Sequence, residues 1–415
     1  MTQEVEPVSY NFLLAWGCHN AATQVCLPAS NPGQFWTPTD VAVDPSGKYV
    51  YVADSNNNRV QKFDGLGNFL LQWGALGSGP GSFNGPLGIA LDSSSKSVYV
   101  VDAANDRVQK FDGSGKFITT WGSNGSDPSQ FSDPQFVAVD SSGNVYVTDG
   151  GNFRVEKFDS SGKFITQWGS RGAGPGQFQG QEGVAVDPSG KYVYVADSGN
   201  YRIQKFDSSG NFVMQWGSPG SGNGQFGSGI GTGFSGFGPG NLAVDSSGNV
   251  YVTDTGNYRV QKFDGSGNYI TQFGSYGPGS AQFEGLGGVA VDSSGDLYVV
   301  DEADNRVEKF APAGTTGTLC VIVAAAVGST VAAASVQWLR AYRDTRFKAM
   351  PWGALLISKA ENLYYRVSPR MVGVVERDPR LKKAIRWIFV LPVLRMLSSF
   401  ALMEIGSAPR ELEHT

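Results

Sequence analysis

The feature that most restricts how this chain can fold is a phrase set of about 48 residues that recurs six times between residues 10 and 310. The first phrase resembles V-A-V-D and ends at Asp44, Asp92, Asp140, Asp187, Asp245 and Asp292. A Y-V-x-D phrase and an N-x-R-[VI]-x-K-F phrase follow, and a fourth phrase ends in W-G or F-G.

Each phrase has the composition of a short strand. The phrases are rich in β-branched and aromatic residues, and turn sequences such as D-P-S-G-K and D-S-S-G-N separate them. Four antiparallel strands per repeat are typical of a β-propeller blade, and closing the sheets into a ring protects their edges. The sequence therefore predicts six blades.

The two ends of the repeat region predict how the ring closes. The sixth repeat stops at Phe310 without a W-G phrase, whereas the chain begins with an unpaired one, N-F-L-L-A-W-G, at residues 11–17. We predict a mainly β domain over residues 1–312, a six-bladed β-propeller in which the N-terminal strand completes the last blade.

Residues 10–310 resemble NHL repeats, on phrases such as D-S-N-N-N-R, D-G-G-N-F-R and D-T-G-N-Y-R. The resemblance implies a propeller. The lyases of this family depend on His-ligated zinc, but the chain has only two His, His19 and His414, neither of them in these phrases. RNA-binding members present a basic face, whereas residues 1–317 carry 18 Lys and Arg against 30 Asp and Glu, so we expect no nucleic-acid partner.

The Asp and Arg that recur in every repeat are interpreted as structural. An acidic strand end followed by Asn and Arg predicts an internal ion pair and a turn cap, used six times. A functional site is expected where one repeat departs from the others.

Polar departures occur just before the innermost strands, where they would surround the central channel. They are Asp40, Gln135, Glu182 and Asn241. Their oxygens could bind a hard cation such as Ca²⁺, and the set is similar to the channel site of six-bladed lactonase-type enzymes, with Asp40, Glu182 and Asn241 as its ligands. The alternative is that they are solvated residues at the channel mouth.

Aromatic departures are expected on the same face. Phe153, Tyr201 and Tyr258 stand where other repeats have Asn or Asp, and Trp36 lies nearby in the repeat pattern. Beside an acidic channel they would suit a peptide or glycan partner, or they could be ordinary loop packing. A Gly-rich insertion over residues 227–240 falls on this face too.

Two modifications are candidates in the first part of the chain. Cys18 and Cys26 would form a disulfide if their segment is extracellular, and otherwise would be two free thiols. Asn124 begins an N-G-S glycosylation sequon.

Residues 313–415 differ in character and predict a small, apolar, α-helical module. Residues 317–339 carry no charge and are long enough to span a bilayer, and the basic residues that follow place that flank in the cytoplasm and the propeller outside. A second apolar run, residues 387–403, contains Pro392 and Arg395. The first helix would either enter lipid or pack against the second run or against other subunits.

This segment also resembles a CFI-box C-terminal domain. Cys320 stands at the Cys position of the box, and L-Y-Y-R-V-S-P and R-D-P-R-L follow in order. The resemblance implies a surface or exported protein of bacteria or archaea. The first residues, M-T-Q-E-V-E-P-V-S-Y, do not read as a signal peptide.

The leading hypothesis is a non-enzymatic cell-surface interaction protein. Its propeller would bind a protein or glycan, and its C-terminal helices would mediate membrane association or self-association. The first alternative is a subunit of a homopolymeric surface filament or layer. The second is a lactonase-type hydrolase with a divalent ion in the channel.

Overall fold

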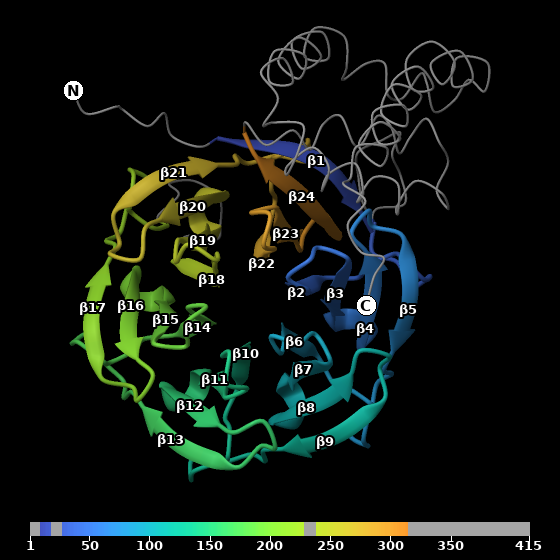
Figure 1. Cartoon of the computed structure of the whole chain (residues 1–415), viewed down its shortest axis with the longest axis horizontal. Helices are drawn as coiled ribbons and strands as arrows, with labels where there is room; N and C mark the ends of the chain where they lie inside the picture. Colours follow the sequence, from blue (N-terminus) through green and yellow to red (C-terminus); the bar gives the residue numbers. More distant parts are fainter. Residues whose placement is uncertain (1–8, 18–26, 228–237, 314–415) are drawn as a thin grey trace, which may run out of the picture. The chain divides into compact units, whose positions relative to one another are not determined.

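The computed structural model describes residues 9–17, 27–227 and 238–313. They all belong to the first of two compact units, Met1–Ala313 and Gly314–Thr415. The described residues form 24 strands in six four-stranded antiparallel sheets. Figure 1 shows the sheets as six blades around a central axis, with the first strand of each blade innermost. The predicted six-bladed β-propeller is therefore confirmed.

The blades follow the four phrases of each repeat. Blade 1 contains β2 (Pro38–Val43), β3 (Tyr49–Asp54), β4 (Arg59–Asp64) and β5 (Phe69–Trp73). Blade 2 contains β6 (Pro86–Leu91), β7 (Ser97–Asp102), β8 (Arg107–Asp112) and β9 (Phe117–Trp121). Blade 3 contains β10 (Pro134–Val139), β11 (Val145–Asp149), β12 (Arg154–Phe158) and β13 (Phe164–Trp168).

The second half of the ring repeats this order. Blade 4 contains β14 (Gln181–Val186), β15 (Tyr192–Asp197), β16 (Arg202–Asp207) and β17 (Phe212–Trp216). Blade 5 contains β18 (Pro239–Val244), β19 (Val250–Asp254), β20 (Arg259–Phe263) and β21 (Tyr269–Phe273). Blade 6 contains β22 (Leu286–Val291), β23 (Leu297–Asp301), β24 (Arg306–Pro312) and β1 (Tyr10–Trp16).

Short 3-10 helices join the second and third strands of the first five blades. They are η1 (Ser55–Asn57), η2 (Ala103–Asn105), η3 (Gly150–Asn152), η4 (Ser198–Asn200) and η5 (Thr255–Asn257). A connecting segment then leads from each outer strand to the inner strand of the next blade and contacts these helices. For example, Ala103 of η2 donates its N–H to the carbonyl of Gly85, in the segment between β5 and β6, at 3.3 Å. We call the side of the ring that carries both kinds of loop the loop face.

The core lies between neighbouring blades, which explains the nearly continuous apolar runs of the second strands. In β3, Val50 and Val52 pack toward blade 6, while Tyr51 and Ala53 pack toward blade 2. Successive residues of a strand point to opposite faces of its sheet. Because each sheet is covered on both faces, both sets of side chains are apolar.

A glycine in each turn between third and fourth strands locks one blade onto the one before it. Gly115, with φ of +84°, lies so close to the Trp73 ring that an added Cβ would stand 2.7 Å from it. Only glycine combines this backbone conformation with this approach. Gly67 of blade 1 contacts Trp16 of β1 in the same way, so the interlock continues through the closure.

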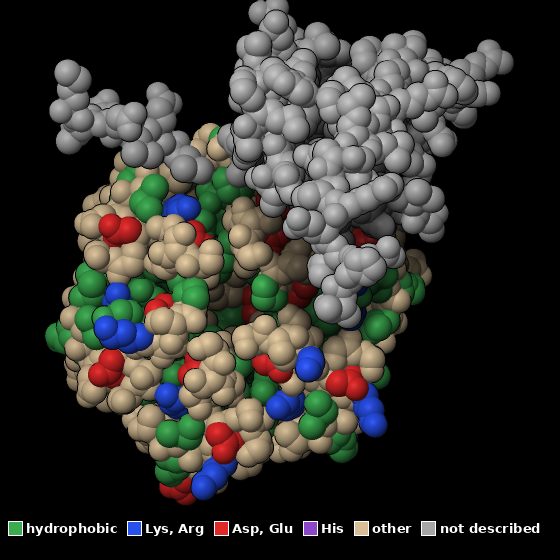
Figure 2. Space-filling view, in the orientation of Figure 1, with side chains coloured by type: hydrophobic (Ala, Val, Ile, Leu, Met, Phe, Trp, Pro, Cys, Tyr) green, Lys and Arg blue, Asp and Glu red, His purple; other side chains and the backbone are tan. Residues whose placement is uncertain are grey.

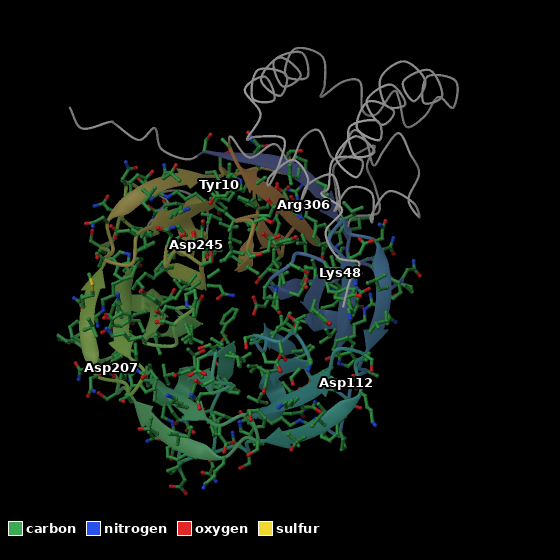
Figure 3. The ribbon with its side chains drawn as sticks, in the orientation of Figure 1. Tyr10, Lys48, Asp112, Asp207, Asp245 and Arg306 are labelled. Atoms are coloured by element: carbon green, nitrogen blue, oxygen red, sulfur yellow. The ribbon has the colours of Figure 1, made fainter. Side chains whose placement is uncertain are left out.

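The N-terminal strand completes the ring as the sequence predicts. β1 pairs antiparallel with β24, with Phe12 opposite Phe310 and Trp16 opposite Val307. Lysines in the third strands of five blades reach carbonyls in the next blade's turn, as Lys62 Nζ does with Gly113 O at 2.8 Å. Lys262 of blade 5 meets Tyr10 Oη instead, at 3.5 Å. Figure 3 shows Tyr10 and Asp245 close together at this junction.

Candidate functional site

The recurring Asp and Arg form a buried ion pair in all six blades, which confirms the predicted pairing. The carboxyl oxygen and the nearest guanidinium nitrogen lie 2.7–2.9 Å apart. In blade 1, Arg59 also donates to the carbonyls of Ser30, Asn31 and Gln34 in the preceding connecting segment. Figure 3 shows the equivalent Arg306 inside blade 6. These networks hold the loop face together and are structural.

Beside the axis, two of the predicted ligand residues contact each other. Asn241 Nδ2 donates to Asp40 Oδ1 at 2.8 Å, from blade 5 to blade 1. The innermost strand of blade 6 lies between them, and a Cβ at its Gly288 would overlap the Asp40 carboxyl. Asp40 also accepts the N–H groups of Val41 at 2.9 Å and Ile89 at 2.8 Å. The Asp40 carboxyl therefore joins blades 1, 2 and 5.

Two glutamates complete a group that we call the axial cluster: Asp40, Glu182, Asn241 and Glu302. The side chain of Ser198 hydrogen-bonds Glu182, and burial raises the pKa of Glu182 to about 7. Burial, followed by repulsion from Glu182, Asp301 and Asp40, raises the pKa of Glu302 to about 8. Burial likewise raises the pKa of Asp40 to about 8. The cluster favours a proton or a positively charged group.

Glu302 is not among the predicted ligands, which all lie at the start of the inner strands. It stands instead in the loop after β23, one position past the strand-ending Asp. The other blades have Ser55, Ala103, Gly150, Ser198 and Thr255 there. An acidic residue at one of six equivalent positions was the signal that could have identified it.

The predicted metal set of Asp40, Gln135, Glu182 and Asn241 stays a prediction. Gln135 lies in blade 3 beside Gly150, where an added Cβ would stand 3.3 Å from Gln135 Cγ. Within residues 9–17, 27–227 and 238–313, no group of three or more His, Cys, Asp or Glu has a metal-holding arrangement.

Three of the four predicted aromatic residues form an arc over consecutive blades of the loop face. Phe153, Tyr201 and Tyr258 end η3, η4 and η5 in the left-handed conformation, with φ of 56°, 54° and 55°. Arg171 lies over the Phe153 ring at 5.3 Å, and the Tyr258 and Tyr276 ring centroids are 4.9 Å apart.

Trp36 lies on the same face but apart from this arc. Its side chain is 46% exposed, and its backbone N–H donates to Asp54 in blade 1. The next residue, Thr37, donates to Asn305 in blade 6. Trp36 therefore stands at the junction of blades 6 and 1, opposite the arc. Figure 2 shows one face of the ring, where acidic, basic and apolar side chains are interspersed.

The remaining predicted residues are placed as follows. Asn124 is exposed, and its Nδ2 lies 3.1 Å from Asp106 Oδ2. Cys18, Cys26, most of the insertion at 227–240 and the two apolar segments at 317–339 and 387–403 lie outside the described residues. Within the described part of the chain, no helix has the length and hydropathy to cross a bilayer.

Comparison with known proteins supports the fold. A family model described as a 6-bladed beta-propeller matches residues 41–123, and the NHL repeat model matches residues 131–158, 182–206 and 238–263. The structural-genomics protein of unknown function from Bacteroides thetaiotaomicron is 19% identical. The match covers 68% of this chain and 71% of that one, with a TM-score of 0.52. The chain thus contains NHL repeats within a six-bladed propeller.

A lyase also resembles this chain. The catalytically inactive virginiamycin B lyase from Staphylococcus aureus, solved with quinupristin, is 14% identical. The match covers 69% of this chain and 82% of that one, with a TM-score of 0.47. The CFI-box resemblance falls outside the described residues.

Proposed function

We propose that this propeller is a non-enzymatic binding module whose loop face takes a protein partner with a basic segment. The observation that carries the proposal is the aromatic arc. Bulky residues in the left-handed conformation are uncommon and strained, and such strain concentrates at functional sites. Phe153, Tyr201 and Tyr258 all adopt it.

The equivalent residues of other blades indicate what the arc replaces. Asn58 Oδ1 accepts the N–H of Gly85 at 2.9 Å, and Asn305 Oδ1 accepts that of Thr37 at 2.7 Å. These bonds tie one blade to the next loop, and asparagine tolerates the left-handed conformation well. Phe153 cannot form such a bond through its side chain. Phe153 and Tyr201 pack partly against the interblade cores, and we propose that a partner contacts the rest of these rings.

The charge of the axial cluster indicates the kind of partner. Asp40, Glu182 and Glu302 bring three carboxyl groups together beside the axis, and residues 1–317 are acidic overall. Acidic and aromatic surfaces suit Lys and Arg side chains, through ion pairs and cation–π contacts. NHL propellers commonly mediate protein interactions, which agrees with this choice over a glycan.

We further propose that the propeller acts at the cell surface and that residues 313–415 anchor or assemble it. The uncharged stretch at 317–339 and its basic flank motivate this location. Protease treatment of intact cells should remove the propeller. An untouched propeller would contradict the external location while leaving the binding proposal standing.

The binding proposal is tested with substitutions that the fold already accepts. The triple variant F153N, Y201N and Y258N places in blades 3–5 the residue that blades 1 and 6 have. Fluorescence anisotropy would follow labelled peptides, one rich in Arg and Tyr and one with Glu in place of Arg. We expect the full-length protein to prefer the basic peptide, and the triple variant to bind it at least about tenfold more weakly.

The control is I118T, on the exposed outer edge of blade 2 and away from the loop face. It should bind as the unmodified protein does. Equal affinity for the two peptides, or equal losses in both variants, would refute the proposal. Hydrolysis of lactones or esters by the purified protein, with or without added Ca²⁺, would instead favour the hydrolase alternative.

A further inference from the structure

One buried position has a different residue type in blades 3 and 6 from that in the other four blades. It is the third residue of the third strand, and its side chain is fully buried in every blade. Four blades have glutamine there: Gln61, Gln109, Gln204 and Gln261. Blades 3 and 6 have glutamate, Glu156 and Glu308.

The glutamine side chains make the same three hydrogen bonds each time. In blade 1, Gln61 Oε1 accepts the N–H of Gly33 at 2.8 Å. Gln61 Nε2 donates to Gln34 O at 2.7 Å and to Asp54 Oδ2 at 3.0 Å. The amide thus bonds the connecting segment twice and the ion-paired Asp once. Blades 2, 4 and 5 repeat these bonds.

The glutamates can reproduce only part of this pattern. Glu156 Oε2 accepts the N–H of Ser129 at 2.9 Å, and Glu308 Oε2 accepts that of Ala281 at 3.0 Å. Their Oε1 atoms have no hydrogen-bond partner with good geometry among the described residues. A carboxylate oxygen stands where the glutamines place a donor, and an ionised carboxylate can only accept.

Charge balance is also different in these two blades. Arg154 pairs with Asp149 at 2.8 Å and with Glu156 Oε1 at 2.5 Å, so one guanidinium serves two carboxyl groups. Blade 6 goes further. Arg306 lies near Asp301, Glu308 and Asp304, at 2.9–3.1 Å, and Asp304 replaces the Asn of the other blades.

The connecting segment departs from the pattern at the same two places. The residue whose N–H reaches the Gln or Glu has positive φ in every blade. It is glycine in the four glutamine blades, Gly33, Gly81, Gly176 and Gly224. It is Ser129 or Ala281 in the glutamate blades, with φ of 68° and 58°. A strained residue therefore depends on the bond to each glutamate.

We propose that Glu156 and Glu308 are proton-controlled latches of the loop face. Each carries a proton on Oε1, which makes Oε1 a donor in the place of the glutamine Nε2. Release of this proton to solvent leaves repelling oxygens against the Asp carboxylate and loosens residues 126–130 or 278–282. Blades 3 and 6 lie on opposite sides of the ring (Figure 1), so the loop face has two such latches.

The groups around each latch set the pH at which it opens. Glu156 faces Arg154 and Asp149, and its cross-strand partners are the uncharged Val147 and Gln167. The connecting segment presents the carbonyls of Asp127 and Gln130 to Arg154. Burial is the largest influence and raises the pKa of Glu156 to about 7, although the Ser129 N–H and Arg154 act to lower it.

The latch in blade 6 has more acidic neighbours. Glu308 faces Arg306, Asp301 and Asp304, and its cross-strand partners are Val299 and Ala15. Burial raises the pKa of Glu308 to about 8, against the lowering effects of Arg306 and the Ala281 N–H, and Asp301 and Asp304 act in the same direction as burial. The blade 6 latch should therefore open at higher pH than the blade 3 latch.

Hydrogen exchange on the full chain tests the proposal. The amides of Ser129 and Ala281 are compared at about pH 6 and about pH 9, each corrected for its intrinsic exchange rate. When the pKa of a glutamate is raised as far as that of Glu156, the amide bonded to it should lose about tenfold in protection over this range. E156Q should reduce the loss at Ser129 to less than about twofold and leave Ala281 unchanged, and E308Q should do the reverse.

Blade 4 provides a gain-of-function test that does not depend on those variants folding. Q204E with G176S copies the blade 3 pair, so the amide of residue 176 should acquire the same loss of protection at high pH. The proposal fails if Ser129 and Ala281 keep constant protection relative to Gly33 across the range. It also fails if the glutamine variants keep the pH dependence. Neither outcome depends on whether the loop face binds a protein.

Discussion

Asp40 illustrates how one side chain can define the centre of a repeat protein. The other inner strands have Gly88, Phe136, Gly183, Asn241 and Gly288 at its position. Its two oxygens accept three N–H donors from three blades, and the glycines leave room for this arrangement. Burial outweighs these bonds and raises the pKa of Asp40 to about 8, so the carboxyl is mainly the neutral acid at neutral pH, and both of its oxygens can still accept.

We therefore expect Asp40→Asn to destabilise the propeller. An amide can accept from two of the donors, but its NH₂ group must then face the third. A buried donor without an acceptor costs about 1–3 kcal/mol. Urea unfolding at neutral pH measures the loss. Asp106→Asn is the control, since Asn58 and Asn305 fill the equivalent place in other blades, and it should change stability little. Equal losses in the two variants would argue against this role of Asp40.

At the scale of elements, the strands were readable from sequence because their signals are local. A blade phrase such as Y-V-Y-V-A-D carries its own alternation and its own turn, and six copies reinforce one another. The contact between Asn241 and Asp40 was predicted only as proximity. The direct hydrogen bond also requires Gly288, because a side chain there would overlap the Asp40 carboxyl. Gly288 lies in the strand between Asp40 and Asn241 in space, but it is distant from both in the sequence. Glu302 differs, because its acidic side chain at one of six equivalent positions is a signal that the sequence does contain.

The closure by β1 leads to a prediction about the chain ends. A chain lacking residues 1–17 would expose the edge of β24 and remove Trp16 from the interface of blades 6 and 1. An unpaired edge with apolar neighbours promotes association. Light scattering should show this truncated chain as oligomers, whereas a chain lacking only residues 1–8 should keep the mass of the unmodified protein. A peptide covering residues 9–17 should reverse the association, and its failure to do so would count against the closure as the cause.

At the scale of the whole molecule, the propeller concentrates acidic groups in buried places. Burial raises the pKa of Asp40, Glu182, Glu302, Glu156 and Glu308 to between about 7 and about 8. Several carboxyls in exposed turns behave in the opposite way. Hydrogen bonds from Ser114, and then from the backbone, hold the pKa of Asp112 below its usual value. The turn carboxyls therefore stabilise the fold best at neutral pH, whereas the axial cluster and the latches stabilise it best at mildly acidic pH.

These shifts predict the pH dependence of stability, with opposite signs on the two sides of the optimum. The buried acids bind more protons in the folded state, so stability falls as the pH rises from about 4.5 to about 8. The turn carboxyls are lost as stabilising groups when the pH falls below about 4. Maximum stability should therefore lie near pH 5, and the melting temperature should drop by at least about 5 °C by pH 8.5.

The double variant E156Q and E308Q separates the latches from the axial cluster in this profile. It should melt higher than the unmodified protein at about pH 8.5 and no higher at about pH 5, because glutamine restores a donor that the protonated glutamate already supplies at low pH. Part of the decline should remain, since Asp40, Glu182 and Glu302 still titrate. Asp112→Asn should alter only the acidic side. Thermal melts from pH 4 to pH 9 would be measured for the unmodified protein, the double variant and Asp112→Asn. If the melting temperature of the unmodified protein stayed constant or rose between pH 5 and pH 8.5, these carboxyl groups would be ionised in the folded protein at no cost in stability.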